Sequence, residues 1–144
     1  MTIYTIGFAG KSAEQFFTLL IEHHVTRVVD VRLNNVNQLA AFSKRDDLRY
    51  FLKHLAEIDY VHLPQLAPSE ELLRGYRSES MSWPEYEQRY MQLLTDRNAS
   101  QYIDMALFDC ACLLCSEATP EHCHRRLLAE YIGHLFPDLS IVHL

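Results

Sequence analysis

The segment from Val25 to Val31 constrains the fold of this chain most strongly. It contains Val28, Val29 and Val31, and β-branched residues of this kind favour an extended strand. A nearly continuous apolar strand is buried on both faces, whereas a strand with one exposed face alternates apolar and polar residues. The segment therefore predicts a parallel sheet that is covered by helices on both sides.

Short apolar runs alternate with stretches of helical periodicity along the rest of the chain. Ser12 and Gln15 form a possible capping box, and Ser82 precedes Trp83 and Pro84 in a typical helix start. Strands that alternate with helices predict an α/β domain of three layers, with a mostly parallel sheet of about five strands flanked by helices. The expected strands are residues 3–6, 25–31, 60–63, 110–114 and 140–144, and helices are expected to begin near residues 12, 46, 69, 82, 100 and 119.

Length and composition define the class of protein. A chain of 144 residues with 22% charged residues predicts one globular domain over residues 1–144. No run of about 18 apolar residues occurs, which predicts no membrane span and no membrane partner. Residues 1–7 carry neither a basic region nor a cleavable apolar segment, which predicts a cytoplasmic protein. A net charge of −6 argues against a general duplex-binding protein, although it leaves a local basic cleft open.

Reactive side chains follow the expected strands at their carboxyl ends. Asp30 and Arg32 lie at the end of the second strand, and Cys115 and Glu117 lie at the end of the fourth. Because ligands bind outside the carboxyl ends of parallel strands, we expect these groups at one rim of the sheet. A structural ion pair that holds a loop is the alternative for Asp30 and Arg32. The same rim should receive Gly7 from the first strand and His143 from the fifth.

The helix expected after Thr119 brings a second thiol to this rim. Pro120 suits the first helical position, so the unpaired N–H groups of residues 120–123 would form an anion site. In that first turn the helix dipole would favour a thiolate at Cys123. Cys123 also precedes Leu127 by four residues, and plain burial in the core is the alternative.

Cys115 is the stronger candidate for a nucleophile, because a strand end places its side chain at a cleft, although a second buried thiol is the alternative. A zinc cluster must also be weighed, since four cysteines and His124 lie within fifteen residues. Strand periodicity, however, points Cys112 and Cys115 to opposite faces of the sheet. A metal site could therefore use only Cys115, Cys123 and His124, joined by Glu117 or His143.

A basic segment is the remaining signal for nucleic acid. Arg49 and Lys53 are four residues apart on an expected helix, and Lys44 and Arg45 precede them. Such a row is typical of the solvated face of a helix, and a nucleic-acid patch is the alternative. The phosphate-binding loop, the dinucleotide-binding glycine motif and the G-x-S-x-G hydrolase motif are absent.

Several segments resemble the prokaryotic family called domain of unknown function DUF488. They include Y-T-I-G-F at 4–8, V-D-V-R at 29–32, Y-V-H-L at 60–63 and V-H-L at 142–144. The motifs L-N-N at 33–35, Q-L-A at 38–40 and C-L-L-C-S-E-A-T-P-E-H-C-H-R-R at 112–126 indicate one subgroup. The resemblance implies an α/β fold with a shared site at these motifs, and it implies no established reaction.

The leading hypothesis is a small enzyme without a cofactor, a cysteine-dependent hydrolase or transferase that acts on an anionic or nucleotide-like substrate. Cys115 would be the nucleophile, Glu117 or Asp30 the acid or base, and His124 a proton carrier. Arg32 and Arg125 would hold the anion together with the helix start. The remaining candidates for substrate contact are Gly7, Asn34, Cys123, Arg126 and His143.

Two rival hypotheses remain open. In a non-catalytic module for nucleotides or nucleic acid, Asn34, Asn35 and Gln38 would contact base edges, and Tyr50, Trp83 and Tyr86 would stack on bases. The other rival is a metal-dependent protein. Neither hypothesis indicates an oligomeric state.

Overall fold

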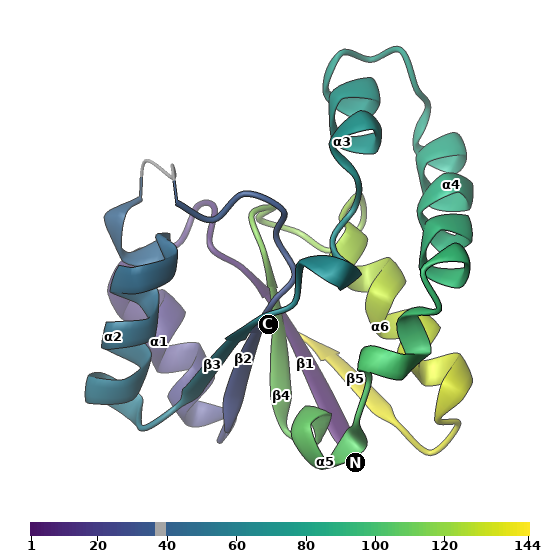
Figure 1. Ribbon diagram of the computed structural model, residues 1–144. Coiled ribbons are helices and arrows are strands. Elements are labelled where there is room, and N and C mark those ends of the chain that lie inside the picture. The colour runs from purple at the N-terminus through teal and green to yellow at the C-terminus, as the bar shows by residue number, and fades with distance from the viewer. Residues whose placement is uncertain (37–39) are drawn as a thin grey trace.

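A single parallel sheet forms the centre of the molecule. The computed structural model describes residues 1–36 and 40–144. The strands lie in the order β3-β2-β4-β1-β5, and all four pairings are parallel (Figure 1). Their bounds are Thr2–Gly7 for β1, Arg27–Asp30 for β2, Asp59–His62 for β3, Ala111–Cys115 for β4 and Ser140–His143 for β5. The predicted α/β class with a parallel sheet is confirmed.

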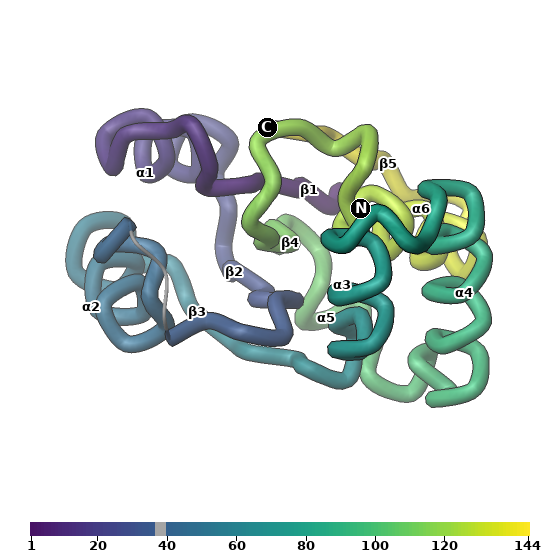
Figure 2. The backbone as a smooth tube through the Cα atoms, turned by 90° about the horizontal axis from the view of Figure 1, so that it is seen from above, coloured from purple at the N-terminus to yellow at the C-terminus, as the bar shows by residue number. Residues whose placement is uncertain are grey.

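Helices cover both faces of this sheet, as Figures 1 and 2 show. On one face lie α1 (Ala13–Glu22) and α2 (Arg45–Ala56), and on the other lie α4 (Trp83–Asp96) and α6 (His124–Leu135). Helix α3 (Glu70–Arg77) rises beyond the carboxyl ends of the strands beside α4. Helix α5 (Met105–Phe108) is a single turn before β4. No helix in the described ranges is long and apolar enough to cross a membrane.

Alternate residues of the strands pack into two separate hydrophobic cores. In β4, Leu113 joins the core beneath α4 and α6, while Cys112 and Leu114 join the core beneath α1 and α2. In β2, Val28 and Val29 divide in the same way, and both are fully buried. Burial of successive residues is what the apolar run in this strand predicts, because a sheet between two helical layers has no solvated face.

The predicted helix starts at Ser12 and Ser82 are confirmed. The Ser12 hydroxyl accepts from the Gln15 amide at 3.1 Å, and the Gln15 side chain accepts from the Ser12 amide at 2.9 Å. The Ser82 hydroxyl accepts from the Glu85 amide at 3.3 Å. Side chains at these positions satisfy N–H groups that the first turn of a helix leaves unpaired.

Two predicted helices differ from the structure. Residues 100–108 form a 3₁₀ turn (Ala99–Tyr102) and the separate helix α5, because Asp104 is extended and caps the Ala106 amide at 2.9 Å. The prediction that Thr119 and Pro120 begin the last helix is wrong. Helix α6 begins at His124, and the Thr119 side chain instead hydrogen-bonds the Glu121 carboxylate in a local turn.

This later start also removes the predicted anion site at the amides of residues 120–123, since these residues precede the helix. Cys123 is the N-cap residue of α6, with an extended backbone, and it does not lie in the first helical turn.

The chain leaves the neighbouring strands β1 and β4 toward opposite faces of the sheet. Gly7 pairs with Cys115 at the last register position, and the Phe8 and Ala9 amides then donate to the carbonyl oxygens of Cys115 and Ser116 at 3.4 and 3.1 Å. Strand β1 leads to α1 on one face, and β4 leads to α6 on the other. Such a change of direction between adjacent parallel strands marks the edge of the sheet at which α/β proteins bind ligands.

Candidate functional site

Gly7 allows the chain after β4 to fold back over the end of β1. A Cβ atom on Gly7 would overlap the carbonyl oxygen of Glu117 and would lie 2.6 Å from Arg125 Nη1. Only glycine leaves room for this approach of two backbones. The position thus serves to bring Glu117 and Arg125 against the strand ends.

Arg125 is a fully buried cation that contacts sulfur. Its Nη1 donates to Cys115 Sγ at 2.8 Å, to the Glu117 carbonyl oxygen at 2.6 Å and to Cys123 Sγ at 3.6 Å. Its Nε and Nη2 are buried and have no hydrogen-bond partner among the described residues. Because a buried charge is costly unless it is paired, the guanidinium favours a negative charge on a sulfur beside it.

The two thiols respond to this environment in opposite directions. Burial raises the pKa of Cys115, but the hydrogen bond from Cys123 and the charge of Arg125 outweigh burial, so the pKa lies below its ordinary value. Burial and the neighbouring Cys115 raise the pKa of Cys123 above its ordinary range. The site therefore favours a thiolate at Cys115 that accepts a hydrogen bond from the thiol of Cys123.

Asp30 holds Arg32 in place behind the site. Its carboxylate accepts from Arg32 Nε and Nη2, both at 2.8 Å, and from the Arg32 amide, Asn35 and Tyr60. Burial raises the pKa of Asp30, but Arg32 outweighs burial and lowers it overall. These contacts agree with the alternative interpretation of Asp30 and Arg32, in which the two side chains form a structural ion pair that holds a loop. Arg32 Nη1 is buried without a partner among the described residues, so one N–H of this cation stays available.

His124 is a neutral imidazole at the edge of the site. Burial lowers its pKa to about 4, despite the contact of its Nε2 with the Val31 carbonyl oxygen at 2.9 Å. In the neutral ring Nε2 carries the proton that this contact needs, which leaves Nδ1 as the acceptor.

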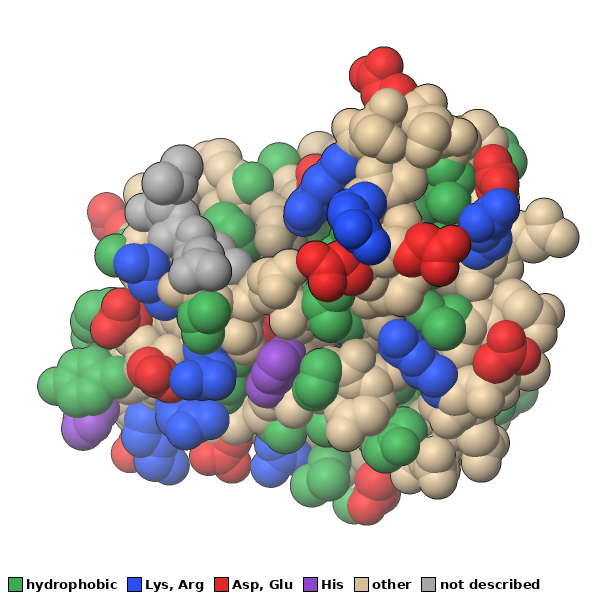
Figure 3. All heavy atoms as spheres, turned by 45° about the horizontal axis from the view of Figure 1, so that its top comes forward, with side chains coloured by type: hydrophobic (Ala, Val, Ile, Leu, Met, Phe, Trp, Pro, Cys, Tyr) green, Lys and Arg blue, Asp and Glu red, His purple; other side chains and the backbone are tan. Residues whose placement is uncertain are grey.

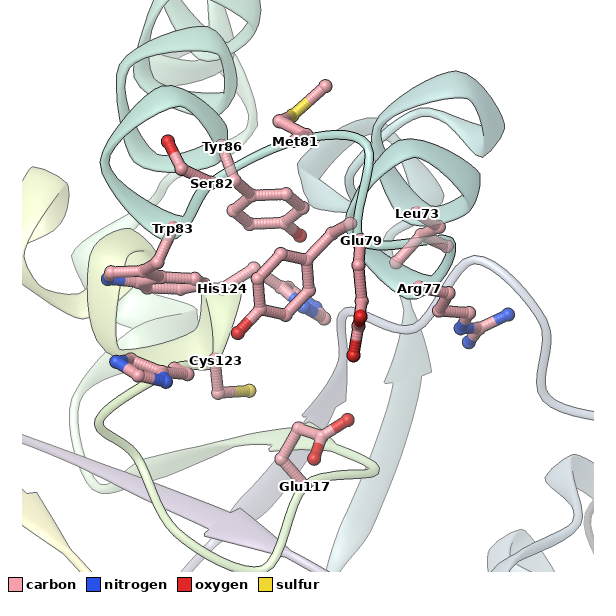
Figure 4. A pocket seen from close by; sticks show the side chains of 12 residues that line it. Leu73, Arg77, Glu79, Met81, Ser82, Trp83, Tyr86, Glu117, Cys123 and His124 are labelled. Carbon is pink, nitrogen blue, oxygen red and sulfur yellow. The ribbon is translucent and has the colours of Figure 1, made fainter.

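A pocket of about 490 Å³ opens between α3, α4 and the chain after β4 (Figure 4). Trp83 and Tyr86 form one wall, with ring centroids 5.1 Å apart and planes 19° from parallel. Arg77 lies on the opposite wall, and Cys123 and Glu117 lie at the floor. The remaining lining residues are Leu73, Tyr76, Glu79, Met81, Ser82, His122 and His124.

A smaller cavity of about 60 Å³ lies next to this pocket and is bordered by Cys115. The two spaces share Leu73, Arg77, Glu117 and His124 in their linings. The smaller one is also lined by Arg32, Leu33, Asn34, Pro68, Cys115 and Ser116. Cys115 itself has 0% exposure to bulk solvent.

Of the other predicted site residues, Arg126 and His143 line neither cavity, whereas Asn34 borders the smaller one. Arg126 pairs with Glu130 at 2.8 Å and with Glu87 at 3.3 Å, across α4 and α6. His143 Nδ1 contacts the Thr5 hydroxyl at 2.6 Å on β1, and His143 lines neither cavity. Asn34 is exposed at the rim of the smaller cavity. The prediction for Gln38 falls outside the described residues.

The basic segment of α2 is largely neutralised by neighbouring acids. Arg45 pairs with Asp46 at 3.0 Å, and Lys53 pairs with Asp59 at 3.6 Å. Basic and acidic side chains are interspersed on the face that Figure 3 shows. Tyr50 lies on α2, across the sheet from Trp83 and Tyr86, so these three rings do not form one stacking surface. These contacts favour the solvated-face interpretation.

Several lining residues were not among the predicted site residues. Arg77 makes no ion pair with another described residue and lies between the two cavities. Lys11 donates to the Gly7 carbonyl oxygen at 2.9 Å, and burial together with Arg125 lowers its pKa. The detectable signal was Trp83 itself, since a tryptophan in the first turn of a helix occupies a position that the core does not require.

Nothing in the described ranges resembles a metal centre: no three His, Cys, Asp or Glu side chains are grouped so that they could hold an ion.

Comparisons with known proteins identify a family without assigning an activity. No curated protein and no solved structure matches the chain. As the motifs around Cys115 and Cys123 predicted, the family described as domain of unknown function DUF488 matches residues 12–132, which is most of the chain, and the protein therefore belongs to this family.

Proposed function

We propose that the protein is a cysteine-dependent hydrolase or transferase that acts on an anionic, nucleotide-like substrate. The observation that carries this proposal is the contact of the buried Arg125 with Cys115 Sγ at 2.8 Å, beside a cavity that shares lining residues with the larger pocket. A cation that keeps a thiol ionised is a recurrent means of activating a cysteine nucleophile.

The pocket suits a planar ring that carries a negative charge. Trp83 packs against the rings of Tyr86 and His122, and this aromatic wall offers a surface on which a base can pack without regard to its identity. Arg77 and Arg32, whose Nη1 has no partner among the described residues, line the smaller cavity and supply positive charge at the inner end. Because Glu79 lines only the larger pocket and Arg32 lines only the smaller cavity, the anion belongs on the side of the smaller cavity, toward Cys115.

In the proposed reaction Cys115 attacks the electrophilic atom next to the anion, and a covalent bond to sulfur replaces the bond to the leaving group. Glu117, which borders both cavities, is placed to protonate the leaving group. Water or a second substrate then breaks the bond to sulfur, with His124 Nδ1 as proton acceptor. Such a thiolate requires reducing surroundings, which agrees with a cytoplasmic protein.

A chromogenic nucleotide ester tests the proposal. With thymidine 5′-monophosphate p-nitrophenyl ester, we expect release of p-nitrophenolate by the unmodified chain and by Cys112→Ser, and no release by Cys115→Ser. Cys112 is the matched control because it is equally buried but belongs to the other core. Equal release by Cys115→Ser, or no release by the unmodified chain with this ester and with p-nitrophenyl phosphate, contradicts the proposal.

A non-catalytic nucleotide-binding module is the second candidate. The full burial of Cys115, beside a pocket that is open at its aromatic wall, favours binding without chemistry. The chain has a single tryptophan, so quenching of Trp83 fluorescence by adenosine 5′-monophosphate measures binding directly. Quenching that is equal in Cys115→Ser and in the unmodified chain, without release from the ester, supports this candidate.

A further inference from the structure

Cys115 and Cys123 share one cation and contact each other. Both sulfurs accept from the same nitrogen, Arg125 Nη1, at 2.8 and 3.6 Å. A hydrogen bond also joins the two thiols, and both are free in this structure. A thiolate beside a thiol, held by a guanidinium, is the starting arrangement for disulfide formation.

The later part of the chain between these cysteines can adjust without disturbing the sheet. The carbonyl oxygens of Ser116 and Glu117 accept from the Ala9 amide at 3.1 Å and from Arg125 at 2.6 Å, which fixes the start of this segment. Residues 118–122 form neither helix nor strand, and most of them are exposed. Cys123 precedes the first turn of α6 with φ of −137°, and no side chain caps the helix at this position. The sulfur of Cys123 can therefore approach that of Cys115 through a movement of residues 118–123.

The other two cysteines cannot take part in this pairing. Cys112 belongs to the core beneath α1 and α2, and burial raises its pKa above the ordinary range. Cys110 precedes β4, at the end of the strand that is opposite to Cys115. Both are internal controls for any oxidation of the chain.

We propose that Cys115 and Cys123 form a reversible disulfide when a hydroperoxide enters the pocket. The cavity of about 60 Å³ beside Cys115 admits a molecule of this size, since a water molecule takes about 30 Å³ of liquid volume. The inference stands apart from the proposed function, because it requires the two thiols and Arg125 but no nucleotide substrate.

The reaction has two steps. The Cys115 thiolate attacks one oxygen of hydrogen peroxide, the O–O bond breaks, and the departing hydroxide takes a proton from solvent, which leaves a sulfenic acid at Cys115. Cys123 then attacks this sulfur, and the displaced hydroxide and the Cys123 proton leave as water. The two sulfurs together lose two electrons to the peroxide, and a dithiol reductant returns them through thiol–disulfide exchange.

Peroxide titration of the full chain tests this inference. We expect equimolar hydrogen peroxide, followed by alkylation and peptide mass mapping, to give a linkage between Cys115 and Cys123 that dithiothreitol reverses. Cys112→Ser and Cys110→Ser should form the same linkage. In Cys123→Ser we expect a sulfenic acid at Cys115 that dimedone traps, and in Cys115→Ser no linkage. Far-UV circular dichroism of each variant establishes that it is folded.

Several results overturn the inference: a linkage through Cys110 or Cys112, a sulfinic acid at Cys115 without a linkage in the unmodified chain, or no oxidation at either thiol. The outcome of this peroxide experiment does not decide whether the protein has the proposed hydrolase or transferase activity. A reduced chain that releases no p-nitrophenolate but forms the disulfide with peroxide, or a reduced chain that releases p-nitrophenolate but forms no disulfide, separates the two conclusions.

Discussion

Arg125 is unusual among buried cations in that sulfur, and not a carboxylate, lies against it. Replacing Arg125 by methionine keeps the volume of the side chain and removes its charge. Burial is then opposed only by the hydrogen bonds from Cys123 and from the Glu117 backbone, so the pKa of Cys115 should rise. We expect alkylation of Cys115 by iodoacetamide below pH 8 to slow by at least tenfold, because the thiolate fraction falls. Arg126→Met, whose guanidinium pairs with Glu87 and Glu130, is the control and should leave the pH profile unchanged.

The close approach of two backbones at Gly7 predicts that adding a single methyl group at this position lowers the free energy of unfolding. In Gly7→Ala the added Cβ meets the backbone of Glu117, which cannot rotate away, and we expect a loss of about 3 kcal/mol or more in the free energy of unfolding. Gly133→Ala is the matched control, since its Cβ would meet only Ile141 Cδ1 at 3.4 Å, in the last turn of α6. Because alanine favours a helix over glycine, that change should stabilise by about 0.5–1 kcal/mol. Urea denaturation measures both, and equal effects would contradict the assigned close approach at Gly7.

Among the helices, α4 both contributes to stability through its N-terminal cap and carries Trp83 in the wall of the pocket. Ser82 caps the turn that carries Trp83, whereas Ser12 caps α1 on the other face of the sheet. Replacing either serine by alanine should cost about 1 kcal/mol of stability. Only Ser82→Ala should also weaken quenching of Trp83 fluorescence by adenosine 5′-monophosphate, because its first turn frays at the pocket wall. An equal loss of quenching in Ser12→Ala would show that general destabilisation, and not the local position of Trp83, controls binding.

The same elements explain what the sequence could predict. Val28, Val29 and the capped start at Ser12 define strand and helix through local patterns, and these predictions are confirmed. The start of α6 was wrong because Thr119 can cap either a helix or a turn, and the choice depends on the packing of Cys123 beside Cys115, which is not a local property. The contact of Arg125 with Cys115 could be expected as convergence at the strand ends. The sequence could not predict that the chain after β4 passes close to the backbone of Gly7 and thereby brings Arg125 to Cys115.

At the scale of the whole molecule, α3 and α4 turn a strand-end crevice into a pocket. The segment between β3 and β4 contributes nothing to the sheet, but it places Arg77 and Trp83 over the thiols (Figure 1). The aromatic residues there are too far from Cys115 in sequence for any short motif to join them. The proposed aromatic wall and the proposed nucleophile thus lie in separate parts of the chain, and the parallel sheet brings them together.

The pH dependence of global stability tests how firmly this assembly keeps His124 neutral. Its pKa is lowered by burial from about 6.5 in the unfolded chain to about 4, so between these values the unfolded chain binds a proton that the folded chain does not. The stability contribution is therefore fully present above pH 6.5 and is lost as pH falls to 4, by at most about 3 kcal/mol. We expect the unfolding free energy of the unmodified chain, relative to His124→Gln, to decline across this window in urea titrations. His54→Gln, at an exposed position on α2, controls for the loss of an imidazole. A difference between the unmodified chain and His124→Gln that stays constant from pH 7 to pH 4 would mean that the imidazole is accessible to protons in the folded protein, and that His124 is not held as a neutral acceptor beside the thiols.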